Sequence, residues 1–120
     1  MKKNLTLYPS TRRQAAGTVY SSDWTDVSYF HEMLLILAVT AQGAYTNETL
    51  DITVQGKDAN GNIFTLAQFT QVGNVISVLP YLEPLKLGNF GQFIRAKVVT
   101  AGTAVDYTFS VLGFAKRFSE

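Results

Sequence analysis

The chain has 120 residues, the usual length of one domain, and is long enough to bury a hydrophobic core without disulfides or metals. It holds no cysteine and one histidine, which excludes disulfide scaffolds, thiol nucleophiles, cysteine-based zinc or iron–sulfur sites and any site that needs two histidines. Ten basic and nine acidic residues leave a net charge of +1, whereas dedicated nucleic-acid-binding proteins normally carry a strong basic excess.

The chain begins with a basic segment, residues 1–13, that contains no acidic residue. Polar residues follow the two opening lysines so closely that the apolar stretch of a secretion signal is missing. Apolar and polar residues alternate inside the segment, which suits an edge strand over residues 5–9 or the addition of a strand to a neighbouring sheet edge. The segment could also be a solubilising tail.

We predict an extended N-terminal arm, residues 1–13, followed by one domain, residues 14–120. Its basic residues could meet an acidic surface on a partner protein. If the arm carries the contact, deleting it should leave a folded domain that no longer binds. The predicted contact residues are Leu5, Leu7, Tyr8, Arg12 and Arg13.

The next segments predict a short edge strand at residues 18–21, a turn at residues 23–26 and a longer element at residues 32–41. The longer element holds a run of Met, Leu and Ile that would fit a short helix or a strand. No capping box precedes it, and its length suits a strand that is buried on both faces. We therefore predict a central strand.

Alternation is clearest at Leu50, Ile52 and Val54, which are separated by polar residues and predict a strand with one buried face. The dipeptide Asn60-Gly61 is a strong hairpin signal, because both residues accept positive φ. A return strand should follow at residues 63–68. The later expected elements are a turn at residues 73–74, a strand at 75–82 that Pro80 ends or moves to an edge, a loop at 88–91, a strand at 93–99, a turn at 101–103 and a strand at 105–114.

About seven or eight strands at regular spacing, with no long amphipathic helical segment, predict an all-β fold. The expected architecture is an antiparallel β-sandwich or barrel, and a jelly-roll-like sandwich is our first choice.

The residues that could support chemistry are few. His31 is the only imidazole, and a structural role is the simpler interpretation. Asp58, Asn60 and Asn62 resemble the first ligands of a calcium loop, but Phe69 stands where the closing carboxylate should be, and a hairpin turn explains the same residues. We therefore predict no catalytic residue, no metal and no cofactor, and we expect that the protein is not an enzyme.

Three aromatic residues near expected loops are candidates for exposed contacts: Trp24, Tyr45 and Tyr81. Exposed aromatic rings can stack on sugars or fill protein interfaces. They support an alternative function, a carbohydrate-binding or attachment module.

Several segments carry a resemblance to a known family, in chain order: Thr11-Arg12, 32–41 (EMLLILAVTA), 50–55 (LDITVQ), 58–62 (DANGN), 66–71 (LAQFTQ), 93–103 (FIRAKVVTAGT) and 107–111 (YTFSV). Through them the chain resembles a family of small β-sandwich virion proteins of tailed bacteriophages. The turn from Lys57 to Gly61 and residues 72–89 depart from the family pattern.

The resemblance implies a non-enzymatic structural component of the particle, and most of all a capsid decoration or cement protein that stabilises the head. Its partners would be the major capsid protein and further copies of itself, with a trimer favoured, and neither nucleic acid nor a membrane. The protein would be made in the host cytoplasm and would lie on the capsid exterior. Under the alternative function it would be a carbohydrate-binding or host-attachment module on a tail or head fibre of the virion.

Overall fold

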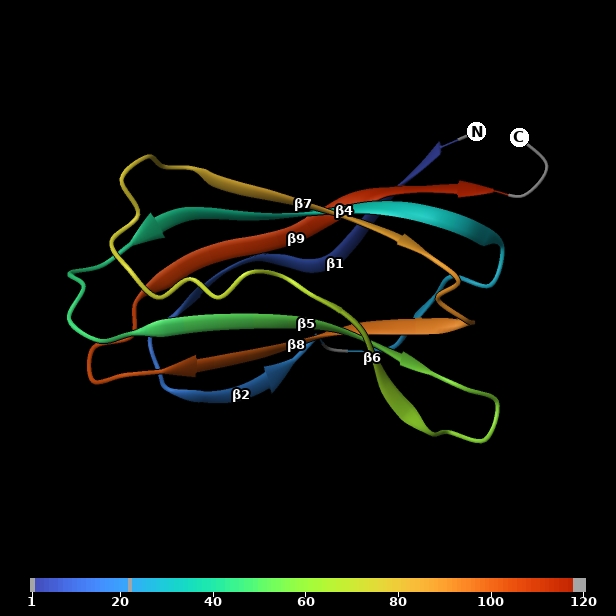
Figure 1. Ribbon diagram of the computed structural model, residues 1–120, viewed down its shortest axis with the longest axis horizontal. Coiled ribbons are helices and arrows are strands. Elements are labelled where there is room, and N and C mark those ends of the chain that lie inside the picture. Colours follow the sequence, from blue (N-terminus) through green and yellow to red (C-terminus); the bar gives the residue numbers. More distant parts are fainter. Residues whose placement is uncertain (1, 22, 118–120) are drawn as a thin grey trace.

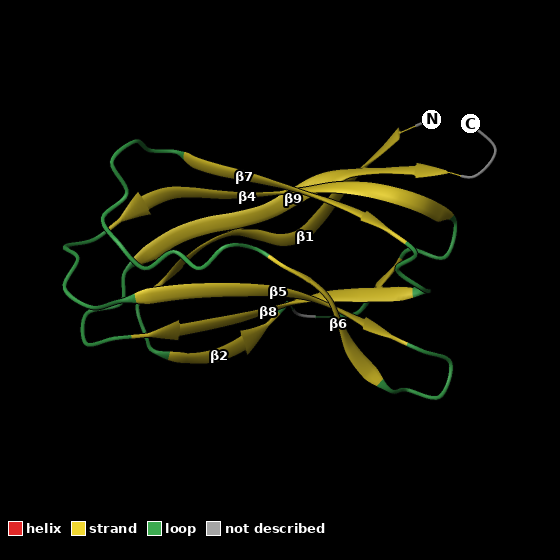
Figure 2. Ribbon diagram, viewed as in Figure 1, coloured by secondary structure: helices red, strands yellow, loops and turns green. Residues whose placement is uncertain are grey.

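The computed structural model describes residues 2–21 and 23–117, and this part of the chain consists of strands and loops (Figures 1 and 2). No helix in it is long and apolar enough to cross a membrane. In chain order the strands are β1 (Lys2–Arg13), β2 (Gly17–Tyr20), β3 (Thr25–Asp26), β4 (Phe30–Gln42), β5 (Thr49–Lys57), β6 (Ile63–Gln68), β7 (Tyr81–Gly88), β8 (Phe93–Ala101) and β9 (Tyr107–Arg117).

The strands form two antiparallel sheets that stack on one another as a sandwich (Figure 1). One sheet has the order β1-β9-β4-β7, and the other has the order β2-β8-β5-β6 with the short β3 beside β8. Apart from β3, the eight strands pair from the outside of the sequence inward: β1 with β9, β2 with β8, β4 with β7 and β5 with β6. This nested pairing defines a jelly roll, so the predicted fold class is confirmed.

The core lies between the sheets and follows the period of two that strands impose on their side chains. Strands β5 and β8 alternate between buried and half-buried residues, except that β8 ends on the exposed Ala101. The predicted inward residues Leu50, Ile52 and Val54 are 1% exposed or less. The hairpin at residues 58–62 also forms, with Gly61 at φ 83° and the Asp58 amide donating to the Asn62 carbonyl.

Strand β4 is central, as predicted, because it lies between β9 and β7. The expectation that it is buried on both faces is wrong. Leu35 and Val39 point into the core and are fully buried, whereas Leu34 and Ile36 are half-buried on the outer face. No described part of the chain forms a third layer over that face. The apolar run therefore places alternate side chains in the core and on the outer surface of the sheet.

The basic N-terminal segment is strand β1 of the sandwich, which corrects the predicted arm and the domain boundary at residue 14. It pairs with β9 from Lys2 opposite Lys116 to Arg13 opposite Tyr107, with two register shifts on the way. The alternation that we interpreted as suited to a neighbouring sheet edge is satisfied by the last strand of the same chain. Removing β1 would uncover β9 and open the core, so a folded domain without residues 1–13 is not expected.

The strand predicted at residues 75–82 is also wrong, because β7 begins only at Tyr81. The preceding residues form a loop in which Val75 and Val78 are 64% and 73% exposed. Gln42 at the end of β4 holds this loop through two hydrogen bonds: its Nε2 donates to the Asn74 carbonyl, and its Oε1 accepts from the Ile76 amide. These side-chain bonds take the place of a strand ladder.

Candidate interaction surface

The outer face of the β1-β9-β4-β7 sheet is apolar in its centre. Outward positions of a sandwich strand are normally polar. Here Leu112 and Phe114 of β9 point outward and are 43% and 44% exposed, and Leu34 and Ile36 of β4 lie beside them. Contiguous exposed apolar side chains usually mark an interaction site. We call this set, together with Ala38, Leu82 and Pro84, the apolar face.

The strand register arranges the apolar face in rows that cross the sheet. Side chains opposite one another on adjacent strands lie within contact distance, so each row is a continuous strip. Each row is given in the strand order β1, β9, β4, β7. The first row is Asn4, Phe114, Leu34 and Lys86, and the second is Thr6, Leu112, Ile36 and Pro84. The third row has no residue from β1 and consists of Ser110, Ala38 and Leu82.

Phe114 projects between two shallow hollows of this surface. One hollow is lined by Leu34, Lys86 and Phe114, and the other by Ile36, Leu112 and Phe114. An aromatic ring flanked by hollows can insert into a partner while the partner fills the hollows, the arrangement that concentrates binding energy in interfaces.

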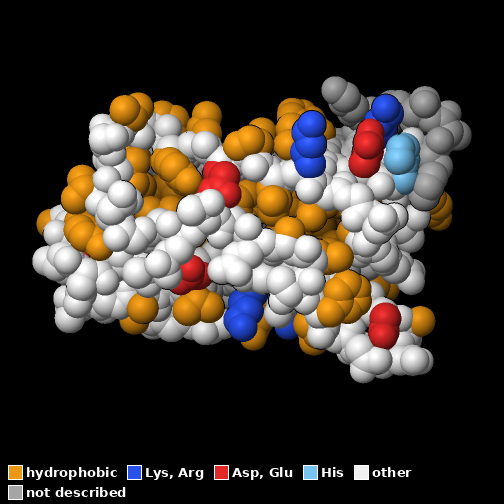
Figure 3. All heavy atoms as spheres, in the orientation of Figure 1, with side chains coloured by type: hydrophobic (Ala, Val, Ile, Leu, Met, Phe, Trp, Pro, Cys, Tyr) orange, Lys and Arg blue, Asp and Glu red, His pale blue; other side chains and the backbone are white. Residues whose placement is uncertain are grey.

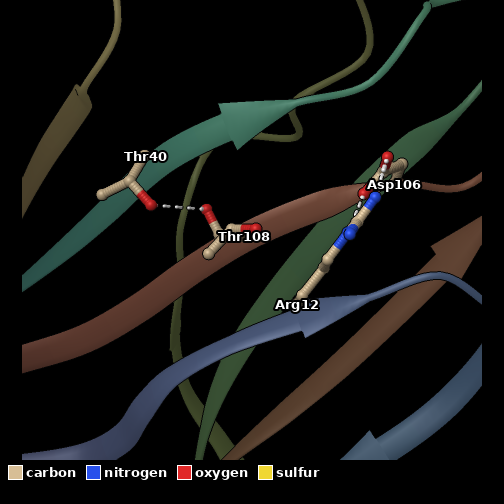
Figure 4. A network of polar contacts seen from close by, with 4 residues as sticks. All are labelled: Arg12, Thr40, Asp106 and Thr108. Atoms are coloured by element: carbon tan, nitrogen blue, oxygen red, sulfur yellow. Dashed lines mark hydrogen bonds and ion pairs between the residues drawn. The ribbon is translucent and has the colours of Figure 1, made fainter.

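Polar and charged groups border the apolar face at both ends. At one end Lys116 Nζ lies 3.6 Å from Glu32 Oε1, with both side chains about half exposed. At the other end Arg12 forms an ion pair with Asp106, and the Thr40 hydroxyl donates to the Thr108 carbonyl across β4 and β9 (Figure 4). Figure 3 shows hydrophobic side chains along the upper border of the molecule, with charged ones toward its right end. A dry centre with a polar rim is the usual composition of a protein–protein interface.

The predicted contact residues of the N-terminal segment do not lie on this face. Leu5, Leu7 and Tyr8 are at most 8% exposed and belong to the core, so they are not available to a partner. Arg12 is exposed, but its Nε and a terminal nitrogen donate to the two Asp106 oxygens at 2.9 and 3.0 Å. This guanidinium lowers the pKa of the Asp106 carboxyl. Arg13 is half-buried.

The three predicted contact aromatics are also separated from one another and only half exposed. The Tyr45 hydroxyl donates to the Gly73 carbonyl at 2.6 Å, and the Tyr81 hydroxyl donates to Glu83 at 2.9 Å. The Tyr45 bond therefore helps to hold the segment between β6 and β7, whereas the Tyr81 bond lies within β7. Trp24 lies on the other sheet, beside Lys57 and Arg95.

The calcium-like residues form the hairpin turn. Asp58 Oδ1 accepts from the amides of Asn60 and Asn62, and Asp58 Oδ2 accepts from the Asn62 side chain. These bonds lower the pKa of the Asp58 carboxyl. In the described part of the chain no three His, Asp or Glu side chains gather in a way that could hold a metal ion.

Sequence reasoning missed a buried carboxylate between the β4–β5 and β8–β9 loops. Glu48 is 2% exposed, and its oxygens accept from the Thr46 hydroxyl at 2.5 Å, the Thr46 amide at 2.8 Å and the Ala104 amide at 3.1 Å. These bonds lower the pKa of Glu48 to about 2. The carboxylate is thus fully engaged in joining two loops.

Sequence reasoning also missed the apolar face, although a signal for it exists. The polar residues Asp106, Thr108 and Ser110 alternate with apolar ones along the last strand, but Leu112 and Phe114 then continue the polar face with large apolar side chains. A break of this kind predicts a covered outer face.

No protein-family profile and no curated protein matches the chain. Solved structures do match. The VP2 subviral particle of infectious bursal disease virus has a TM-score of 0.64 at 13% identity over 98% of this chain, and a mutant VP2 protein of the same virus in derived T=1 particles has 0.65 at 12% identity over 98%. The chain spans about a third of the length of these VP2 chains, since it covers 32% of each.

These matches support a viral capsid β-sandwich fold, and they do not show membership of the tailed-phage decoration family. The similarity extends over nearly the whole described sandwich, so it reflects the complete jelly roll and not a shared hairpin. At this level of identity it concerns the fold alone. The chain thus has the β-sandwich fold found in part of a viral capsid protein.

Proposed function

We propose that this chain is a non-enzymatic structural component of a virus particle, most specifically a decoration or cement protein on the capsid exterior. The observation that carries the proposal is the apolar face, an outer sheet surface that remains exposed on a jelly roll otherwise folded like part of a capsid protein. We propose the major capsid protein as the partner that covers this face.

The energetics of the apolar face suit such a role. Complete burial of a Leu or Phe side chain contributes about 1.5–3 kcal/mol, and Leu112 and Phe114 each retain close to half of their exposure. One copy would therefore bind modestly. Many copies on a symmetric shell would still stabilise it, because each additional contact on the same particle is made at high effective concentration.

Binding to shells tests the proposal. Purified protein is mixed with empty shells of the major capsid protein from the virus that encodes it, and bound copies per shell are counted after sedimentation. We expect saturable binding that falls at least tenfold in the double variant Leu112→Gln/Phe114→Gln, since each tenfold change corresponds to about 1.4 kcal/mol.

The control is the double variant Ile63→Gln/Phe64→Gln. Ile63 and Phe64 lie on β6 of the other sheet and are 49% and 40% exposed, so the control removes a similar amount of exposed apolar surface elsewhere. Thermal melting of both variants checks that they fold. Equal binding by the two variants, or no binding by the unmodified protein, would overturn the proposed contact.

A further inference from the structure

A cluster of cations and aromatic rings lies on the outer face of the β2-β8-β5-β6 sheet, on the side of the sandwich opposite the apolar face. The Arg95 guanidinium is 4.1 Å from the ring centre of Tyr20 and 4.5 Å from that of Trp24. Lys57 Nζ is 4.8 Å from the ring centre of Trp24 and 4.9 Å from that of Phe93. The Trp24 ring is therefore shared by both cations. We call these five residues the cation–aromatic cluster.

The sheet register brings the cluster together from distant parts of the sequence. Lys57 of β5 lies directly opposite Phe93 of β8, and Gln55 lies directly opposite Arg95. All four are outward positions, since the residues between them on both strands are buried. Tyr20 ends β2, and Trp24 precedes β3, so the chain between these strands carries both rings onto β8.

Neither cation is neutralised by a carboxylate in the described part of the chain. The ion pairs found there join Arg12 to Asp106 and Lys116 to Glu32. Arg95 uses its Nε to donate to Gln55 Oε1 at 2.8 Å, which leaves the edge formed by its two terminal nitrogens available. The Lys57 ammonium lies over the two rings and forms no hydrogen bond or ion pair within the described residues. Two positive charges are thus held in place with hydrogen-bond donors to spare.

The donors left on this cluster match a carboxylate. The planar guanidinium edge binds the two oxygens of a carboxylate in parallel, and rings that fix its plane reduce the entropy lost on binding. Tyr20 is 45% exposed, so part of its ring is open to the apolar C–H groups of a ligand next to that carboxylate. We propose that the cation–aromatic cluster binds a sugar that carries a carboxylate group.

A nucleic acid suits the cluster less well. A single strand needs a basic track that follows several phosphates, whereas Lys57, Arg95 and the neighbouring Lys97 form one short basic spot and the whole chain has a net charge of +1. A ligand with one acidic group needs no such track. The inference does not depend on the proposed capsid contact, because the two surfaces belong to different sheets.

The protein contains a single tryptophan, so the fluorescence of Trp24 reports directly on the cluster. We would titrate the purified chain with the α-methyl glycoside of N-acetylneuraminic acid, methyl glucuronide, methyl galactoside, acetate and a short oligothymidylate. We expect saturable changes with the two acidic sugars, and at least tenfold weaker responses to the neutral sugar and to acetate. A stronger response to oligothymidylate, an equal response to acetate, or no response to either acidic sugar would overturn the proposal.

Variants separate a specific site from general charge attraction. Arg95→Gln and Arg95→Lys should each weaken binding of the acidic sugar at least tenfold, because lysine keeps the charge but cannot bind both oxygens in parallel. Lys86→Gln is the control: Lys86 is exposed on β7 of the other sheet, so this variant removes one positive charge outside the cluster, and it should change the affinity less than twofold. Equal losses in the arginine and control variants would show charge attraction alone. Thermal melting checks the fold of each variant, and the titrations of the unmodified protein stand without them.

Discussion

Tyr8 of β1 stacks on Phe109 of β9, with ring centres 5.2 Å apart and ring planes inclined by 18°. Both rings lie in the core, at 8% and 0% exposure. The contact joins the first strand to the last and shows that the basic N-terminal segment stabilises the sandwich from inside. The apolar face of the same sheet is on its other side.

Truncation of Leu7 tests the structural role of β1. Leu7 is 4% exposed, so Leu7→Ala should lower the free energy of unfolding by about 2–5 kcal/mol, the usual cost of a buried leucine replaced by alanine. The neighbouring Thr6 points outward, and Thr6→Ala should stay within about 0.5 kcal/mol. Urea unfolding followed by circular dichroism measures both. Similar values for the two variants would mean that β1 does not pack as described.

Because of Glu48, we expect the free energy of unfolding to decrease in acid. Its pKa is lowered from 4.5 to about 2 in the folded protein, so folding favours the ionised form. The resulting stabilisation is complete above the unfolded value and is lost as the pH falls from about 4.5 to about 2. Glu48→Gln should reduce stability at neutral pH and flatten the loss across that interval. Urea midpoints over the interval, with the exposed Glu32→Gln as control, measure the effect, and parallel curves for Glu48→Gln and the unmodified protein would contradict it.

Gly113 lies on β9 inside its sheet, at a position that has no space for a side chain. A Cβ atom added there would overlap the backbone oxygen of Leu34 on β4, and neither backbone can move without disturbing the ladder. Gly113→Ala should therefore destabilise the protein by about 1–3 kcal/mol, as overpacked cores do. Gly88→Ala is the control, since its Cβ would meet no atom closer than 3.9 Å. Thermal melting should separate the two, and similar melting temperatures would show that β9 and β4 can move apart.

The apolar face predicts that the isolated protein associates with itself at high concentration. In the isolated protein, Leu112 and Phe114 can be covered by further copies of the chain, and we predict a trimer. Light scattering coupled to size-exclusion chromatography should show a mass that rises with concentration and returns to 13.2 kDa in the Leu112→Gln/Phe114→Gln variant. An unmodified protein that stays monomeric at every concentration would exclude the apolar face as a self-association surface.

The strands and their order along the chain were largely predictable, because alternation at Leu50, Ile52 and Val54 and the turn at Asn60-Gly61 are local signals. The partner of each strand was not. Alternation in residues 5–9 fits the edge of any sheet, and only the fold shows that β9 of the same chain provides it. Likewise, Val75 and Val78 have strand-like composition, but Gln42, more than thirty residues away, holds that segment as a loop.

The candidate surfaces were less predictable for a related reason. The cation–aromatic cluster depends on the register that places Lys57 opposite Phe93 and Gln55 opposite Arg95, and no local pattern encodes a register between distant strands. Trp24 was identified as a contact residue from the sequence, but the cations beside it were not. One local signal in the sequence indicated the apolar face: Leu112 and Phe114 are apolar at positions where the strand alternation predicts polar residues.

The nested strand order has a consequence for synthesis. β9 lies between β1 and β4, and β8 lies between β2 and β5, so the last two strands of the sandwich in chain order occupy the middle of their sheets. The β2-β8-β5-β6 sheet cannot close until translation has passed residue 101, nor the β1-β9-β4-β7 sheet until it has passed residue 117, and until then the nascent chain presents unpaired strand edges. The sandwich therefore folds late and as one unit, and a ribosome that stalls before β8 and β9 would release a chain prone to aggregation.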